Sequence, residues 1–151
     1  MATRHVAATL ALSVIFPAAA HADEPRSGDA ASVGTVVPVF DQAITNIPGK
    51  SLVAQDVSYA PGAKDAPHRH AQSAFIMAYV ISGTIRSQVE GESPQIYRAG
   101  QNWQEDPGAH HILAENASNT EPARLLAVFV VDTADKNALT TSDMNPGGNH
   151  E

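Results

Sequence analysis

The chain of 151 residues contains no cysteine. This absence excludes disulfides, thiolate ligands and cysteine nucleophiles, so any metal site must be built from histidine, carboxylate, amide or water ligands. Basic residues are also scarce, with nine Lys and Arg residues against sixteen Asp and Glu residues. Because the sequence offers no basic patch, it argues against a nucleic-acid partner.

No apolar run in the sequence is long enough to span a bilayer. The run from Val6 to Phe16 has eleven residues, follows the basic Arg4, and is followed by Ala20-His21-Ala22. This order of a basic start, an apolar run and small residues predicts a secretory signal peptide over residues 1–22. We therefore expect a periplasmic or secreted protein that starts at Asp23 and has no membrane contact after cleavage. The alternative is a helical membrane anchor.

Removal of the signal peptide leaves 129 residues (151 − 22) and a net charge of −8, because Arg4 is lost from a chain whose net charge is −7. That length is enough for one domain with a core of its own. Polar residues and Gly and Pro predict a flexible mature N-terminus over residues 23–34, and polar residues predict a C-terminal tail over residues 134–151. The domain itself is expected over residues 35–133.

Short β-type segments punctuated by Gly or Pro fill this domain, and none has a convincing helical period. Residues 74–81 and 125–131 are apolar throughout, so we expect two central strands that are buried on both faces. Residues 84–90 alternate between polar and inward-facing positions, Ser87 being among the latter. The pattern predicts an all-β, antiparallel sandwich or barrel such as a jelly roll.

His68 and His70 stand one residue apart shortly before the first apolar run. Side chains at positions i and i+2 of a strand point to the same face, so both imidazoles would lie on one side and Arg69 on the other. Two neutral imidazoles side by side are the start of a metal site. The simpler alternative is a pair of polar residues at an exposed strand edge.

The segment from Gly62 to His70 resembles the first motif of the cupin superfamily, in which five residues separate a glycine from His-x-His. The segment from Gly100 to His111 resembles the second motif, and the two follow in the right order. The resemblance covers residues 50–131 and is to the small, single-domain bacterial cupins of type 2. It implies an antiparallel cupin jelly-roll β-barrel, also called a double-stranded β-helix.

The resemblance also implies a divalent metal ion held by His68, His70 and His111 inside the barrel. Three imidazoles suit Fe, Mn, Ni, Cu or Zn, and the sequence does not choose among them. His110 is adjacent to His111, so strand alternation turns its side chain to the other face.

One residue of the first motif is missing, because its glutamate falls at Ala74 or Phe75. Without a carboxylate the site would keep the full 2+ charge of the ion, which favours an anionic or chelating substrate. Gln72 has the strand parity of the histidine pair, and Glu115 has the parity of His111, so each is a candidate additional ligand or a group that orients one. The alternatives are an exposed loop amide and an ordinary surface carboxylate.

The residues of the first apolar run that share the parity of the histidines are small or aliphatic. We expect Ala74, Ile76 and Ala78 to form an apolar pocket wall. The opposite face of this strand needs cover, from a second layer or from a partner, and the cupin resemblance implies a homodimer.

Three functions are compatible with these patterns. The first, which the resemblance favours, is a metal-dependent oxidoreductase or dioxygenase-like enzyme acting on a small organic substrate. The second is a non-catalytic periplasmic cupin that binds a small ligand or a metal as a sensor or carrier. The third is a structural dimer whose histidines are remnants. No catalytic acid or base is identified by the sequence.

Overall fold

The computed structural model describes residues 33–143, so the predicted signal peptide lies outside the described residues. The strands are β1 (Thr35–Ala43), β2 (Lys50–Tyr59), β3 (Lys64–Asp65), β4 (His68–His70), β5 (Phe75–Ser82), β6 (Thr84–Val89), β7 (Gln95–Arg98), β8 (Asn102–Glu105), β9 (His110–Asn116), β10 (Ala123–Asp132) and β11 (Thr140–Ser142). Within the described range no helix is long and apolar enough to cross a membrane.

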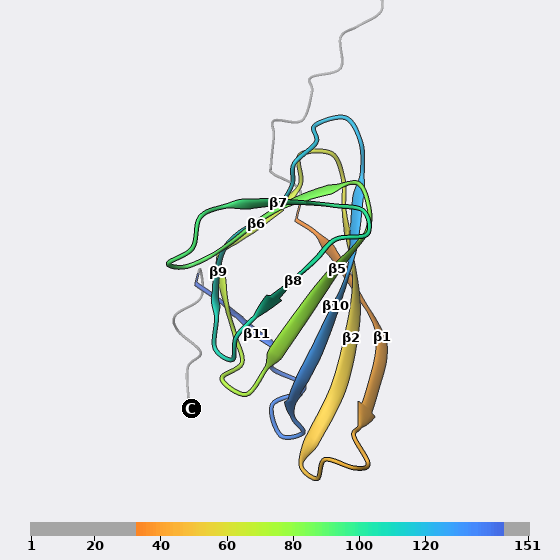
Figure 1. Ribbon diagram of the computed structural model, residues 1–151, viewed down its shortest axis with the longest axis vertical. Coiled ribbons are helices and arrows are strands. Elements are labelled where there is room, and N and C mark those ends of the chain that lie inside the picture. Colours follow the sequence, from red (N-terminus) through yellow and green to blue (C-terminus); the bar gives the residue numbers. More distant parts are fainter. Residues whose placement is uncertain (1–32, 144–151) are drawn as a thin grey trace, which may run out of the picture.

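The strands form two antiparallel sheets that face each other (Figure 1). One sheet has the order β1-β2-β10-β5-β8, and the other has the order β11-β4-β9-β6-β7, with β3 also paired to β9. Side chains from both sheets meet between the layers in one hydrophobic core. The structure confirms the predicted all-β, antiparallel jelly roll.

The two apolar runs form strands β5 and β10, which are neighbours in the middle of the first sheet. Val80 and Val131 are fully buried on the inner face. The expected burial of both faces is wrong for the single chain, because Phe75 and Tyr79 are each 40 % exposed. Successive side chains of a strand point to opposite faces, so these two residues lie on the outer surface of the sheet.

The domain extends beyond its predicted C-terminal limit at residue 133. Leu139 is buried in the core, and β11 pairs with β4 so that Thr140 lies opposite His70 and Ser142 opposite His68. The prediction of a polar tail from residue 134 is therefore wrong for this segment. Three exposed polar residues carry no apolar alternation, and backbone pairing, which sequence patterns do not reveal, places them in the sheet.

Strand β9 contains a β-bulge directly after its second histidine. Gln88 of β6 lies opposite Leu113, whereas Val89 lies opposite His111, so Ile112 is the extra residue. An inserted residue reverses the inward and outward alternation of a strand. His111 and Asn116 are consequently both buried although five positions separate them.

Candidate metal centre

The structure brings the three predicted histidine ligands together between the sheets. His68 and His70 lie on β4, and His111 lies opposite His68 on the neighbouring strand β9. The ring centroid of His68 is 4.9 Å from that of His70 and 5.2 Å from that of His111. One ring nitrogen from each histidine lies within 4.8 Å of the other two, which is a spacing that could hold a metal ion.

The neighbouring basic residues face away from this cluster, as strand alternation predicts. His110 places its Nε2 atom 2.6 Å from Asp143 Oδ2 and its Nδ1 atom 3.1 Å from Arg69 Nη2. These contacts lie on the outer surface of the second sheet. His110 and Arg69 are therefore not ligands of the cluster.

Hydrogen bonds to the backbone and to a serine orient two of the histidines. His68 donates from Nδ1 to the carbonyl oxygen of Ala66 at 3.0 Å, which leaves Nε2 as its free lone pair. His111 Nε2 lies 2.8 Å from Ser87 Oγ, which leaves Nδ1 for the interior. Polar partners of this kind are what orients metal-binding imidazoles.

His70 has no such partner although its side chain is 6 % exposed. Neither of its ring nitrogens makes a hydrogen bond with the described residues. A buried polar atom without a partner is costly, and bound metal is one group that would satisfy it. The donor set therefore fits a divalent ion held by three neutral imidazoles.

Glu105 of β8 also lies against this cluster. No sequence pattern had indicated this residue as part of the site. Its side chain is 3 % exposed, and its Oε2 atom lies 2.9 Å from His70 Nε2. Its Oε1 atom accepts a hydrogen bond from Trp103 Nε1 at 2.9 Å and lies 3.3 Å from His111 Nδ1. Glu105 stands two residues after the apolar Trp103 in the second motif, so strand alternation would have placed both side chains on the same face.

The protonation states of this pair suit metal binding. Burial lowers the pKa of His111 from 6.5 to about 4, although the Glu105 carboxylate by itself would raise this pKa. Burial would by itself raise the pKa of Glu105, but the nearby His70 and His111 and the Trp103 indole reverse this effect, and the pKa is lowered to about 2. Near neutral pH the imidazole is thus neutral and the carboxylate ionised, as ligands must be.

The lowered pKa of His111 predicts acid sensitivity of the metal-free protein. Between pH 6.5 and about 4 the unfolded chain binds a proton at this residue that the folded chain does not bind, so stability is lost as the pH falls through this window. We expect the free energy of unfolding to drop by about 2 kcal/mol between pH 6.5 and pH 5. The stabilising effect of Glu105 is lost only below its ordinary pKa of 4.5.

Urea unfolding of metal-free protein at these two pH values measures the drop. His111→Gln should reduce it, because glutamine does not titrate. If the free energy of unfolding drops equally in the variant and in the unchanged protein, His111 is not the titrating group.

The structure does not bring the two candidate additional ligands to the cluster. Gln72 is exposed and its amide lies against Gly108, because the chain leaves β4 after His70 and turns before β5. Glu115 points outward to Arg86, whose Nε atom donates to its Oε1 atom at 2.6 Å. The expectation that Glu115 shares the face of His111 is wrong because of the bulge at Ile112.

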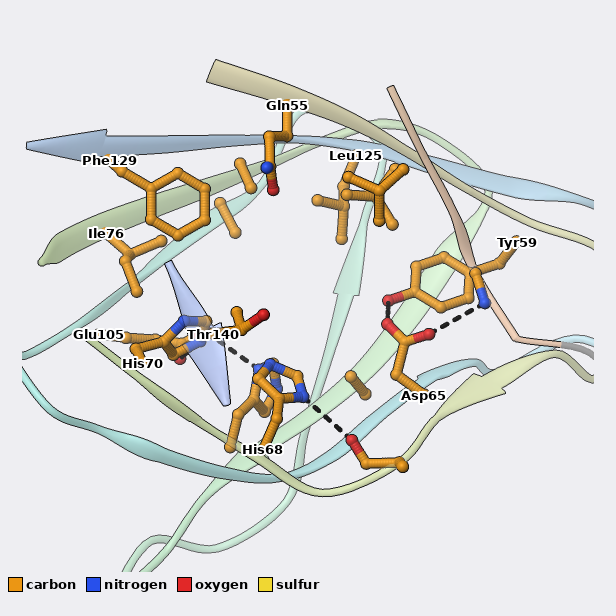
Figure 2. A pocket seen from close by; sticks show the side chains of 18 of the residues that line it. Gln55, Tyr59, Asp65, His68, His70, Ile76, Glu105, Leu125, Phe129 and Thr140 are labelled. Carbon is orange, nitrogen blue, oxygen red and sulfur yellow. Dashed lines mark hydrogen bonds and ion pairs between the residues drawn. The ribbon is translucent and has the colours of Figure 1, made fainter. Parts of the chain in front are cut away.

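A cavity of about 450 Å³ opens beside the histidine cluster. Ile76 and Ala78 line it as expected, whereas Ala74 is buried in the core and does not. Figure 2 shows aliphatic and aromatic side chains on one side of the cavity and the histidines on the other. Its lining includes Gln55, Tyr59, Asp65, Glu105, Leu125, Phe129 and Thr140, none of which the sequence analysis singled out for the site.

The fold and the histidine cluster together define a small β-barrel with a metal-type site between its two sheets. Residues 55–129, about half of the chain, match the family model of the cupin domain. This segment is thus matched as a cupin domain. It matches none of the curated proteins.

Solved cupin structures share this fold at low sequence identity. An RmlC-like cupin with a double-stranded β-helix fold from Methanocaldococcus jannaschii has a TM-score of 0.54 and 15% identity, over 72% of this chain and 90% of that chain. The cupin domain of Schizosaccharomyces pombe Cnp3 has a TM-score of 0.53 and 17% identity, over 68% and 63%.

An enzyme is also among the similar structures. The DMSP lyase DddQ from Ruegeria pomeroyi has a TM-score of 0.56 and 17% identity over 76% of this chain. The present chain spans 54% of the lyase. At this identity the likeness concerns the fold alone.

Proposed function

We propose that this protein is an exported, metal-dependent cupin that acts as an oxidoreductase of the dioxygenase kind on a small organic substrate. The observation that carries the proposal is a cluster of three inward-facing histidines at the edge of a cavity of about 450 Å³. Fe, Mn, Ni, Cu or Zn bound there would supply Lewis-acid chemistry or, for a redox-active ion, activation of O₂.

The cavity has both apolar and polar lining residues, which would bind different parts of a substrate. Ile76, Leu125 and Phe129 offer an apolar surface that would take the hydrocarbon body of a substrate and exclude water from it. Phe129 lies beside the cluster, with its ring centroid 6.0 Å from that of His70, so a substrate whose polar, chelating end faces the histidines would rest its apolar body on this surface (Figure 2). The substrate class that this arrangement favours is a small molecule with one apolar end and one chelating end.

A tyrosine–aspartate pair forms the polar end of the cavity. The Tyr59 hydroxyl donates to Asp65 Oδ2 at 2.5 Å, and the backbone N–H of Gly34 donates to Asp65 Oδ1 at 2.9 Å. Burial and the Asp65 carboxylate raise the pKa of Tyr59, so the phenol stays protonated. The pair can therefore position a polar group of the substrate but is not a ready proton acceptor.

A second function follows from the state of the acidic groups. Both carboxylates that line the cavity, Asp65 and Glu105, already accept hydrogen bonds from the protein. Carboxylates that already hold protein groups in this way suit a non-catalytic sensor or carrier of a small ligand or a metal.

Metal analysis followed by an oxygen-uptake assay distinguishes the two functions. The protein is purified from its native compartment, its metal content is measured, and the loaded protein is given small diketones and thiols under O₂. Substrate-dependent O₂ consumption is expected for the enzyme, whereas ligand binding without consumption would favour the carrier. A protein without stoichiometric metal would contradict the enzyme and the metal carrier.

The proposed function includes export of the protein and two kinds of partner. The basic, apolar and small-residue order of residues 1–22 supports cleavage before Asp23 and a periplasmic or secreted location. Intact-mass measurement of the exported protein should give a chain that starts at Asp23, and retention of Met1 would contradict it. The proposed partners are a small-molecule ligand and a second copy of the chain, and neither a nucleic acid nor a membrane.

A further inference from the structure

We propose that Glu105 is a fourth, anionic ligand of the metal centre, supplied by β8 in place of the glutamate that the first motif lacks. This inference rests on the metal-binding function proposed above. It concerns a residue that neither the motif pattern nor the three-histidine cluster includes.

One oxygen of Glu105 and one ring nitrogen of His70 face each other inside the barrel. Its Oε2 atom and His70 Nε2 lie 2.9 Å apart, yet neither atom has a hydrogen-bond partner among the described residues. Two ligands that bind one ion at about 2.1 Å and at a right angle to each other stand about 3 Å apart. The separation is therefore that of two ligands of one ion as well as that of a hydrogen bond, and the lack of a well-formed hydrogen bond at either atom is what points to an ion between them.

The indole of Trp103 directs the carboxylate. Its Nε1–H group donates to Oε1 at 2.9 Å, which fixes one oxygen and leaves the other facing His70. Trp103 is itself held by stacking on Tyr97, with ring centroids 4.5 Å apart. A ligand oriented in this way needs little rearrangement to bind an ion.

The charge of Glu105 has no permanent counterpart inside the barrel. Its side chain is 3 % exposed, and the ion-pair partners of its oxygens are the imidazoles of His70 and His111. Neither lysine nor arginine is among the described residues that line the cavity. Burial of an ionised carboxylate without a cation is costly, and a divalent ion would supply the missing positive charge.

The topology explains how a carboxylate from another strand reaches the same site. The missing glutamate would have come from Ala74 or Phe75 at the start of β5. Strand β8 is the neighbour of β5 in the sheet, and Glu105 lies opposite Ile76. Ile76 lines the cavity, so a side chain from β8 that lies opposite it can reach the same wall.

This assignment changes the ligand that the site selects. Three neutral imidazoles leave an ion with its full 2+ charge, which was the basis for expecting an anionic substrate. A bound carboxylate lowers the net charge to 1+, and the site then matches a neutral or singly charged chelating group better than a dianion.

Titration of the metal-free full chain with Zn²⁺ tests the assignment. Glu105→Gln keeps the size and the hydrogen bond from Trp103 but loses the charge, and we expect it to weaken Zn²⁺ binding on the order of 100-fold. Glu115→Gln is the matched control, because Glu115 is ion-paired with Arg86 away from the cavity, and we expect a change below about twofold. Unchanged circular dichroism of the metal-free variants shows that both fold.

A crystal structure of the Zn²⁺-loaded protein gives the direct readout. A Glu105 oxygen about 2.0–2.2 Å from the ion is expected. An ion bound by the histidines alone, with equal affinity in Glu105→Gln, would overturn the assignment while leaving the proposed function intact. Failure of the unchanged protein to bind Zn²⁺, Fe²⁺, Mn²⁺, Ni²⁺ or Cu²⁺ would instead overturn the proposed function itself.

Discussion

Alanine in place of any one of His68, His70 or His111 should abolish stoichiometric binding of a divalent ion. Each imidazole offers a ring nitrogen within 4.8 Å of the other two, so the loss of one ligand leaves two from this cluster. His68 and His111 are also oriented by hydrogen bonds that the truncated side chains cannot replace. Metal content after dialysis against trace metal, measured by plasma mass spectrometry, gives the readout.

His110→Ala is the control for this experiment. Its imidazole is adjacent to His111 in the sequence but contacts Asp143 and Arg69 on the outer surface. We expect it to retain its metal. Loss of metal in His110→Ala together with retention in His111→Ala would show that the register of β9 is shifted by one residue.

Aspartate in place of Val80 should prevent folding. Val80 is fully buried on the inner face of β5, which lies between β10 and β8 in the first sheet. An unpaired carboxylate in such a place costs on the order of 5 kcal/mol, which is comparable to the whole free energy of unfolding of a small domain. Circular dichroism and urea unfolding of the purified variant measure the effect.

The adjacent Tyr79→Asp is the matched variant and tests the proposed dimer. Tyr79 is 40 % exposed on the outer face, so the substitution buries no charge within the single chain and should permit folding. Sedimentation should show a dimer for the unchanged protein and a monomer for Tyr79→Asp. A folded dimer of the variant would place the interface elsewhere, and a native-like Val80→Asp would contradict the register of β5.

Patterns that depend on local periodicity could be predicted from the sequence. Spacing of two residues put His68 and His70 on one face, and continuous apolarity identified β5 and β10 as central strands. The same reasoning placed Ser87 inward, where it contacts His111. In each case the feature follows from side-chain alternation within one strand.

Features that depend on pairing between strands could not be predicted in this way. The bulge at Ile112 reverses the alternation of β9 and turns Glu115 outward, and no local composition marks an inserted residue of this kind. Glu105 reaches the histidines because β8 happens to lie beside β5. Its carboxylate, read by itself, is indistinguishable from a surface residue.

The pairing of β11 with β4 means that the last described strand supports two histidines of the candidate site. Strand β4 has three residues, of which two are histidines of the cluster, and such a short strand has little rigidity of its own. It is held on one side by β9 and on the other by Thr140–Ser142. The C-terminal segment thus acts as a clamp on the two imidazoles, and trimming the chain before Leu139 would loosen the site without removing a single histidine of the cluster.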